Sequence, residues 1–374
     1  MAGRGTALAA LAAVLAALAA SAGCGAALAA GGDPRPVGTA VVCRDPAVED
    51  QDDMCIWVDP KDPARSTIVA SDKAAAHLFV YDLAGKTLQS IETPKPGNID
   101  VRYGFPLGGR KVDIVAFNQR TEGYRIVVFA VDPASRRLAR VDNGAILTRA
   151  NYGGTLYHSR KTGDFCFITT SMPGHAEQWL LADDGAGKVR GSLVRTWQVG
   201  FSEAAVGDDE AGKVYVGQES KGVWELPGEP DDPAPPRLVI KTGEHGLHAD
   251  AEGIAIHPNV AGQGRCLVVS NQSRDDFKVY RLDGRFTFVG TFEVAGARDT
   301  DGLDVTAADL GGPFAEGLFA CHTDRQGKPV LLVPWARIAA GLQPPADPQA
   351  APAPEPIRAG GVRTPERAAK GGAP

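Results

Sequence analysis

The sequence predicts an all-β protein, folded over residues 31–342 as a six-bladed β-propeller. Three observations lead to this prediction. Short β-rich runs recur roughly every 45 to 55 residues, which is the spacing of propeller blades. The 45 glycines and 27 prolines favour many short strands joined by turns. Helical periodicity is nearly absent, apart from a turn or two expected over residues 335–342.

The β-rich runs group into six units. In each unit a buried strand is followed by a Gly/Asp turn and then by an alternating strand that ends in a tight turn. Six such units close into a ring that has no long exposed edge. In chain order the runs are 55–58, 67–71, 77–85 and 87–91; 112–117, 124–132 and 137–141; 156–159, 165–169, 178–181 and 194–197; 214–217, 222–226 and 237–240; 253–256, 266–270, 277–284 and 286–289; 302–305, 317–320 and 329–334.

The N-terminus has the pattern of an export signal, and we expect residues 1–30 to be a signal peptide. Arg4 precedes an Ala/Leu run over residues 7–20, which is too short to span a bilayer. The sequence Ala27-Leu-Ala is a candidate cleavage site, whereas Cys24 and the small residues before it also fit a lipoprotein signal. The expected location is therefore the periplasm or the extracellular space, with a lipid anchor at Cys24 or an uncleaved anchor as alternatives.

The C-terminal segment lies outside the propeller units. Residues 343–374 are rich in Pro and Ala and carry charges without an apolar pattern, which predicts a disordered tail. Beyond the N-terminal signal, no segment of the sequence is apolar and long enough to suggest a membrane span. The sequence thus predicts a single folded domain.

The charge balance limits the partners of the protein. Its 39 Lys and Arg residues against 45 Asp and Glu residues give a formal net charge of −6. Nucleic acids and anionic membrane surfaces require a basic footprint, so neither is expected as a partner. An acidic protein can still bind an anionic substrate where metal cations lie between the two. We expect a monomer that binds a small molecule.

The six cysteines suggest different roles. An oxidising compartment allows disulfides, and Cys43 and Cys55 are the pair closest in sequence, although the sequence leaves the pairing open. Cys166, Cys266 and Cys321 each lie inside an apolar strand-like run, which favours buried free thiols. No C-x-x-C spacing indicates a zinc site.

Acidic residues recur at the starts of the units, in what we expect to be loops before the innermost strands. In a propeller these loops converge on one end of the central channel, so each blade can bring a carboxylate to a common point. Unneutralised carboxylates in such a site repel one another, and calcium, which accepts six to eight oxygen ligands, removes that cost. The alternative is that they are ordinary turn residues. The residues are Asp52, Asp53, Asp100, Glu203, Glu219, Glu252 and Asp301.

At these residues the chain resembles a known family. The run Asp52-Asp-Met-Cys-Ile-Trp-Val-Asp-Pro resembles the DDPAIWxDP opening of the β-propeller phytases. Matches to later motifs follow in the same order and cover about residues 50–342, nearly the whole folded domain. They include Lys73 in Ala70-Ser-Asp-Lys and the segments 98–107, 118–123, 152–163, 202–210, 250–254, 270–273, 299–305 and 333–339.

The resemblance implies a calcium-dependent phosphomonoester hydrolase that acts on myo-inositol hexakisphosphate (phytate). Calcium ions at the channel mouth would bridge the enzyme and the substrate phosphates, and a metal-bound water rather than a protein nucleophile would attack phosphorus. Phosphate oxygens would be met by Lys73, Arg120 and Tyr152. A structural calcium would use Asp53 with backbone carbonyls, including that of Ile99. The remaining calcium ligands implied are Asp52, Glu203, Glu219, Glu252, Gln272 and Asp301.

The sequence departs from the family pattern at three places. Met172 stands where the family has a phosphate-binding lysine. Ala40 aligns with a glutamate ligand, and the loop before Asp299 is shorter than in well-known members. These departures weaken the expectation of high turnover, and of activity on phytate itself, without affecting the predicted fold.

Two rival functions fit parts of the pattern. A non-catalytic or weakly active propeller, stabilised by calcium, would bind a phosphorylated ligand or a protein partner. A propeller esterase or lactonase also uses a channel calcium, but it needs a set of His, Asn or Asp residues around one metal. The histidines here, for example His158, His245 and His248, show no such arrangement.

Overall fold

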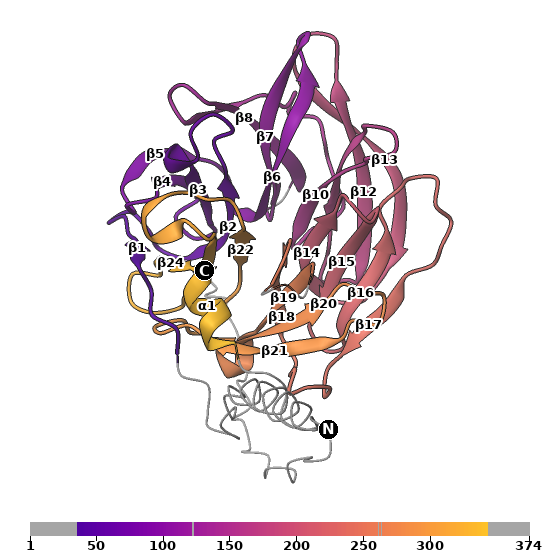
Figure 1. Cartoon of the computed structure of the whole chain (residues 1–374). Helices are drawn as coiled ribbons and strands as arrows, with labels where there is room; N and C mark the ends of the chain where they lie inside the picture. The colour runs from indigo at the N-terminus through magenta and orange to yellow at the C-terminus, as the bar shows by residue number, and fades with distance from the viewer. Residues whose placement is uncertain (1–35, 122, 261, 263, 343–374) are drawn as a thin grey trace, which may run out of the picture. The chain divides into compact units, whose positions relative to one another are not determined.

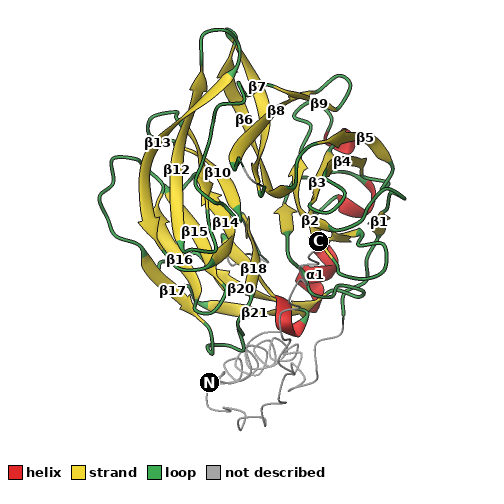
Figure 2. Cartoon of the chain, turned by 180° about the vertical axis from the view of Figure 1, so that it is seen from behind, coloured by secondary structure: helices red, strands yellow, loops and turns green. Residues whose placement is uncertain are grey.

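The computed structural model describes residues 36–342, apart from residues 122, 261 and 263. Six four-stranded antiparallel sheets form a ring around a central channel (Figures 1 and 2). The predicted fold, an all-β six-bladed propeller, is therefore confirmed. The expected signal peptide (1–30), Cys24 and the expected tail (343–374) lie outside the described residues. Among the described residues no helix has the length and apolar character needed to cross a membrane.

Each of the first five blades is one continuous stretch of chain, with its first strand at the channel. Blade 1 contains β2 (Gln51–Trp57), β3 (Thr67–Asp72), β4 (His77–Asp82) and β5 (Thr87–Glu92); blade 2 contains β6 (Pro96–Leu107), β7 (Arg110–Gln119), β8 (Arg125–Asp132) and β9 (Arg137–Arg140); blade 3 contains β10 (Gly154–His158), β11 (Phe165–Thr169), β12 (His175–Asp183) and β13 (Val189–Gln198); blade 4 contains β14 (Ser202–Asp208), β15 (Lys213–Gln218), β16 (Gly222–Pro227) and β17 (Arg237–Lys241); blade 5 contains β18 (Ala251–His257), β19 (Cys266–Asn271), β20 (Asp276–Arg281) and β21 (Phe288–Glu293).

The sixth blade joins the two ends of the domain. Its strands β22 (Leu303–Thr306), β23 (Leu318–His322) and β24 (Val330–Pro334) come from the end of the chain, and the outermost strand β1 (Val41–Cys43) comes from the beginning. In the register of β1 and β24, Val41 lies opposite Leu332. By pairing with β24, strand β1 covers the outer edge of this sheet. The sequence patterns did not predict β1.

Burial falls from the channel to the rim of a blade. All seven residues of β2 are buried, whereas none of the six residues of β5 is fully buried. The apolar core lies between neighbouring sheets. In one cluster, Val69 and Val80 of blade 1 pack against Val115 and Phe117 of blade 2. Because each blade buries its face against the next, removal of one buried phenylalanine side chain is expected to cost about 3 to 5 kcal/mol.

The predicted helical turn near the C-terminal end of the domain is confirmed as α1 (Trp335–Gly341). Trp335 stacks on His257 of blade 5, with ring centroids 3.9 Å apart, and Ile338 is fully buried beside it. Burial lowers the pKa of His257 to about 4, so its ring is neutral in this contact. The helix thus packs against blade 5 directly after the last strand of blade 6.

The suggested Cys43–Cys55 disulfide is wrong. All described cysteines, Cys43, Cys55, Cys166, Cys266 and Cys321, are free and buried. Alternation along β2 places Met54 and Ile56 on the side of the strand that packs with Cys43, whereas Cys55 lies on the other side with Trp57. Cys43 and Cys55 therefore belong to different apolar clusters. Burial raises the pKa of the Cys43 thiol to about 12, which makes it unreactive.

Candidate active site

The expected loop position of the acidic residues is wrong for most of them. Asp52, Asp53, Asp100, Glu203 and Glu252 lie within the innermost strands β2, β6, β14 and β18. Only Glu219 and Asp301 lie outside a strand, directly after β15 and two residues before β22.

A recurring break in register lies at several of these residues. In blades 1, 2, 4 and 5 the pairing of the first two strands skips two residues near the start of the inner strand. The skipped pairs contain Asp52, Asn98, Glu203 and Glu252. Because a bulge re-aims the side chain that it carries, this irregularity explains why acidic residues from separate blades meet.

A second repeated position supplies the other site residues. Lys73, Arg120, Glu219 and Gln272 are each the first residue after the second strand of their blade, that is after β3, β7, β15 and β19. In an antiparallel blade the end of the second strand lies beside the start of the first. The two repeated positions therefore face one another at the same end of the channel.

Lys73 joins two blades at the mouth. Its Nζ lies 2.8 Å from Oδ1 of Asp52 and 3.0 Å from Oδ2 of Asp301, and Oδ2 of Asp50 is 3.7 Å away. Burial alone would lower the pKa of Lys73, but these carboxylates outweigh it and the pKa is raised. Gln272 extends the group, since its Nε2 donates to Oδ1 of Asp301 over 2.6 Å.

Arg120 lies on the opposite side of Asp52 and is almost completely buried. Its Nη2 lies 2.9 Å from Oδ2 of Asp52, forms a very short ion pair with Glu203, and donates to Oδ1 of Asn98 over 2.8 Å. The guanidinium carbon lies 4.5 Å from the centroid of the Tyr152 ring, in a cation–π contact.

Two buried polar atoms of this group lack a directed hydrogen bond. Oδ2 of Asp52 lies close to Arg120 but has no hydrogen-bond partner in the described part of the chain, and neither does Nε of Arg120. Burial alone would raise the pKa of Asp52, but Arg120 and Lys73 together lower it, so the carboxylate is ionised. An ionised, buried and incompletely bonded oxygen is suited to bind a cation.

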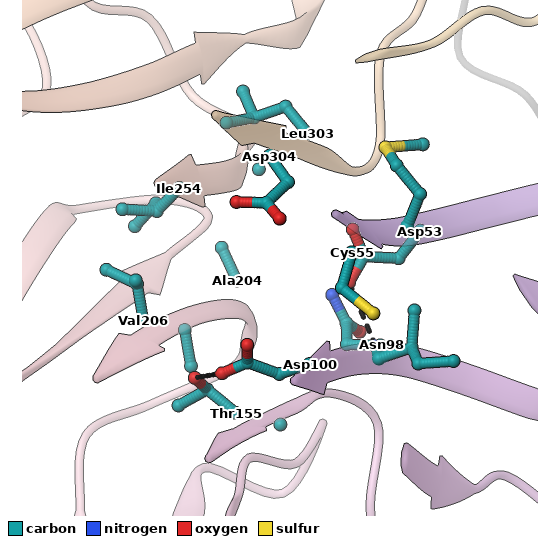
Figure 3. Close-up of a pocket in the computed structure, with 15 residues that line it drawn as sticks. Asp53, Cys55, Asn98, Asp100, Thr155, Ala204, Val206, Ile254, Leu303 and Asp304 are labelled. Carbon is teal, nitrogen blue, oxygen red and sulfur yellow. Dashed lines mark hydrogen bonds between the residues drawn. The ribbon is translucent and has the colours of Figure 1, made fainter. Parts of the chain in front are cut away.

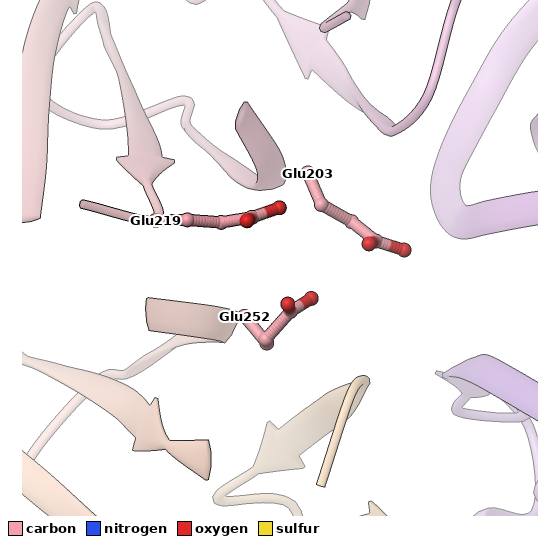
Figure 4. A group of neighbouring side chains, drawn as sticks. All are labelled: Glu203, Glu219 and Glu252. Atoms are coloured by element: carbon pink, nitrogen blue, oxygen red, sulfur yellow. The ribbon is translucent and has the colours of Figure 1, made fainter. Parts of the chain in front are cut away.

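Three glutamates from blades 4 and 5 converge, as Figure 4 shows, and one of them, Glu203, is the ion-pair partner of Arg120. One carboxylate oxygen from each of Glu203, Glu219 and Glu252 lies within 4.8 Å of the others. Glu203 and Glu252 are buried and Glu219 is half-buried. Burial and the neighbouring carboxylates raise the pKa of Glu219 to about 7 and that of Glu252 to about 11. Without a cation the three side chains cannot all be ionised at neutral pH, so this oxygen-rich cluster fits a divalent ion such as calcium.

A second group of carboxylates lies in the channel around a cavity of about 40 Å³ (Figure 3). Asp53 accepts a hydrogen bond from the Ile99 amide over 3.0 Å, so these two residues meet, although through the amide rather than the carbonyl that we expected to bind calcium. Asp304 accepts from the Ile56 amide over 2.7 Å, and burial raises its pKa to about 7. Asp100 is held by Arg102, with 2.9 Å between its Oδ1 and Nη1.

Sequence reasoning missed several residues of the site. Asn98 holds Arg120, and Nδ1 of the buried His322 accepts a hydrogen bond from the Asp301 amide over 3.3 Å. Asp304 contributes to the cavity. Position in the repeat is a usable signal for Asn98, which is the third residue of the inner strand of blade 2, as Asp53 is in blade 1. No comparable signal marks His322.

The departures from the family pattern are visible in the structure. Met172 lies in the turn between β11 and β12 and is 58% exposed. That turn is tied to the site, because the Tyr152 amide donates to the Thr170 carbonyl and the Thr170 hydroxyl donates to the Glu203 carbonyl. Ala40 is exposed, and its amide donates to the Leu332 carbonyl.

Comparison with solved structures supports the architecture. The calcium-binding protein regucalcin from Agrobacterium tumefaciens strain C58 superimposes with a TM-score of 0.51, over 79% of this chain and 94% of the other. The two sequences are 12% identical, so the likeness concerns the fold alone.

Comparison of sequences identifies the family. The 3-phytase of Bacillus subtilis (strain 168) is 36% identical over 311 residues, which cover 78% of this chain and 81% of the relative. The sequence profile of the phytase family matches residues 4–347. The match thus includes every blade and both groups of carboxylates, and the chain belongs to the phytase family.

Proposed function

We propose that this phytase is a calcium-dependent phosphomonoester hydrolase that releases phosphate from myo-inositol hexakisphosphate. The observation that carries the proposal is the connected group at the channel mouth, in which two cationic side chains, Lys73 and Arg120, are interleaved with five carboxylates. An acidic protein can bind a highly anionic substrate there only if cations neutralise the excess carboxylates.

The residues present are sufficient to hold calcium. Even without Asp50, five carboxylates face two side-chain cations, which is an excess of three negative charges when all five are ionised. When bound, calcium would polarise the phosphoryl oxygens and make a bound water a better nucleophile. A separate structural ion would use Asp53. The mouth ligands we propose are Asp52, Glu203, Glu219, Glu252, Gln272 and Asp301.

The side chains of the protein have complementary tasks in phosphoryl transfer. Arg120 offers a planar pair of donors suited to phosphate, and its guanidinium also makes a cation–π contact with Tyr152. Lys73 binds the same group from the side of blade 1. Phosphoryl transfer depends on positioning and charge neutralisation more than on covalent participation of the enzyme, so no protein nucleophile is required.

The proposal is tested by measuring phosphate release from phytate, a simple aryl phosphate and a phosphodiester, each with added calcium and with a chelator. We expect release from the two monoesters in calcium, none from the diester, and loss of activity on chelation. Three variants at the mouth should release little or no phosphate and serve as references in this assay: Asn98→Asp, Arg120→Gln and Glu203→Gln. Calcium binding without phosphate release from any ester would contradict the enzymatic proposal.

That contrary result would favour a second function, binding of a phosphorylated ligand or a protein partner without turnover. One observation supports it: the turn at Met172 has an exposed apolar side chain where the family resemblance implies a lysine. Direct binding of phytate in calcium, in the absence of hydrolysis, would establish this alternative.

We also propose that the protein acts outside the cytoplasm after export through residues 1–30. The basis is the signal-like N-terminal sequence, with Ala27-Leu-Ala before the start of the folded domain. Mass spectrometry of the mature protein distinguishes the outcomes. Cleavage after Ala29 gives a free product, whereas a lipidated Cys24 gives a membrane-anchored one.

A further inference from the structure

Arg120 is almost completely buried, so its surroundings decide how its guanidinium is oriented. Nη2 has carboxylate partners, Asp52 and Glu203, whereas Nε has no hydrogen-bond partner among the described residues. The ion pairs therefore hold one end of the guanidinium, and the position of Nε depends on packing. Uncharged residues of blade 2 and of its connection to blade 3 form that packing.

Gly97 leaves room for Arg120 at the start of the inner strand of blade 2. It is the second residue of β6 and, like Asn98, is skipped in the pairing of β6 with β7. A side-chain carbon placed on Gly97 would overlap Nε of Arg120 and would lie 2.7 Å from Nδ2 of Asn118. Both positions are well inside van der Waals contact, so a larger residue here would displace one of the two side chains.

Asn118 and Asn151 form a buried amide pair between blade 2 and the start of blade 3. Asn118 is the penultimate residue of β7, and its Nδ2 donates to Oδ1 of Asn151 over 3.0 Å. Asn151 lies in the connection from β9 to β10, where its Nδ2 donates to the Thr148 hydroxyl over 2.9 Å. Because a buried amide group that loses its partner costs free energy, the pair holds residue 151 against blade 2.

The amide pair lies next to both members of the cation–π contact. Asn118 comes two residues before Arg120, and Asn151 comes directly before Tyr152, whose ring contacts the guanidinium. The Tyr152 amide donates to the Thr170 carbonyl over 2.7 Å, which holds the backbone on the side of blade 3. One buried hydrogen bond therefore joins the chain beside Arg120 to the chain beside Tyr152.

We propose that Asn118 and Asn151 are positioning residues for the phosphate site, and that Gly97 provides the space in which Arg120 is held. The amide pair keeps the Arg120 guanidinium and the Tyr152 ring in a fixed relation before a phosphate binds, which reduces the ordering that binding requires. Both asparagine side chains are buried, so they act through Arg120 and Tyr152. The inference rests on the proposed function, since it assumes that Arg120 binds the phosphate that is released.

The first test measures steady-state kinetics of Asn118→Leu and Asn151→Leu, which remove the hydrogen bond at similar side-chain volume. We expect kcat for phytate and for an aryl phosphate to fall roughly tenfold, with a smaller change in KM, because both substrates need an oriented Arg120. The control is Gln178→Met, which removes a buried amide that donates to the Gly228 carbonyl over 2.6 Å, away from the mouth. This control should lower Tm and leave both constants unchanged. Unchanged kcat in the two asparagine variants overturns the proposal.

The double variant Asn118→Leu/Asn151→Leu separates positioning from stability. Asn151→Leu alone leaves Nδ2 of Asn118 buried without an acceptor, so its Tm should fall. Replacement of Asn118 as well removes that donor and also Oδ1, which has no hydrogen-bond partner among the residues described. The Tm of the double variant should therefore exceed that of Asn151→Leu, whereas kcat should stay low. If kcat recovers together with Tm, the pair has a structural role only and the proposal is wrong.

Gly97→Ala tests the space around Arg120 without the loss of any hydrogen-bonding group. The added carbon must displace the Arg120 or the Asn118 side chain, so we expect kcat to fall roughly tenfold or more. Gly38→Ala is the matched control, because a carbon added there would have no atom outside the adjoining residues nearer than 3.8 Å. Normal kcat in Gly97→Ala would contradict the proposed fit.

A measurement without substrate keeps this inference separate from the proposed function. The NMR signals of the Arg120 guanidinium, identified by their absence in Arg120→Lys, report rotation about the Nε–Cζ bond. We expect this rotation to be several-fold faster in Asn118→Leu and Asn151→Leu than in the unchanged protein, and unaltered in Gln178→Met. Equal rates in all of these proteins overturn the positioning role. If the unchanged protein does not hydrolyse phytate, the proposed function fails, while the rotation rates still support or refute the positioning of Arg120.

Discussion

Arg120 connects more parts of the site than any other side chain. It contacts carboxylates from blades 1 and 4, the Asn98 side chain and the Tyr152 ring. A lysine in its place would keep the charge but would lose the planar donors and the ring contact. The arginine is therefore needed for geometry as well as for charge.

We predict that Arg120→Lys lowers kcat/KM for phytate roughly 10- to 100-fold, the amount expected from loss of one charged hydrogen bond. Steady-state kinetics in calcium provide the measurement. Arg140→Lys is the control, because Arg140 also forms a close ion pair, 2.9 Å from Asp142, but is not part of the mouth. An Arg120→Lys enzyme of normal activity would remove Arg120 from the proposed phosphate site.

Glu252 is expected to lower the stability of the calcium-free protein, although it is one of the calcium ligands that we propose. Burial, Glu203 and Asp301 raise its pKa to about 11, so without a cation the folded protein must keep this carboxyl protonated. Glu252→Gln removes that requirement while it preserves the shape of the side chain. We predict a higher Tm for this variant than for the unchanged protein at pH 8 in chelator, and a smaller rise in Tm on addition of calcium. Scanning calorimetry of both proteins in chelator and in calcium provides the measurement. A Tm of Glu252→Gln that is lower than that of the unchanged protein by the same amount in chelator and in calcium would contradict the prediction.

At the scale of elements, the β11–β12 turn is where blade 3 departs from the family. Its backbone is held against Tyr152 and Glu203, so a side chain at position 172 is presented at the mouth. We predict that Met172→Lys lowers KM for phytate several-fold, since an added ammonium can bind one phosphate. Met172→Gln is the uncharged control. A rate that stays the same or falls would show that residue 172 does not correspond to the family lysine.

The six blades and the meeting of acidic side chains from different blades were predicted from the sequence, but the construction of the mouth was not. Strand periodicity and the recurring acids predicted six blades and a shared carboxylate site. The bulges that place Asp52, Glu203 and Glu252 depend on pairing between strands, which periodicity along one strand does not specify. Likewise, His322 and Lys328 join the mouth through contacts between blades 6 and 1, far apart in the sequence.

Strand β1 was missed because it is only three residues long, yet it closes the ring. Cys43 is fully buried in a cluster with residues of blades 1 and 6, and β1 covers the edge of β24. We predict that a variant beginning at residue 44 loses about 3 kcal/mol or more of unfolding free energy relative to one beginning at residue 36, and that it associates through the uncovered edge. Urea unfolding and light scattering test this; equal stability of the two variants would contradict it.

At the scale of the whole molecule, the propeller gathers acidic side chains from several blades at one end of its channel. Apolar clusters between neighbouring blades hold the sheets in place, so the inner strands can present buried carboxylates at the channel without support from the mouth itself. The cost of gathering these acids is met by the packing between blades and, in our proposal, by calcium. The protein should therefore be folded without calcium, but less stable and dependent on pH.

The sign of that pH dependence follows from the glutamate cluster. The pKa of Glu219 rises from 4.5 to about 7 on folding, and that of Glu252 to about 11, so above pH 4.5 the folded state binds more protons than the unfolded state. The contribution of these two carboxyl groups to the free energy of unfolding is therefore greatest below pH 4.5, and it decreases as the pH rises through 7. Calcium binds the ionised carboxylates, so its stabilising effect must grow over the same range. We predict that Tm in chelator falls between pH 5 and pH 8, that calcium flattens or reverses this slope, and that Glu219→Gln/Glu252→Gln abolishes most of the difference. A difference between calcium and chelator that does not change with pH would place the stabilising ion away from these glutamates.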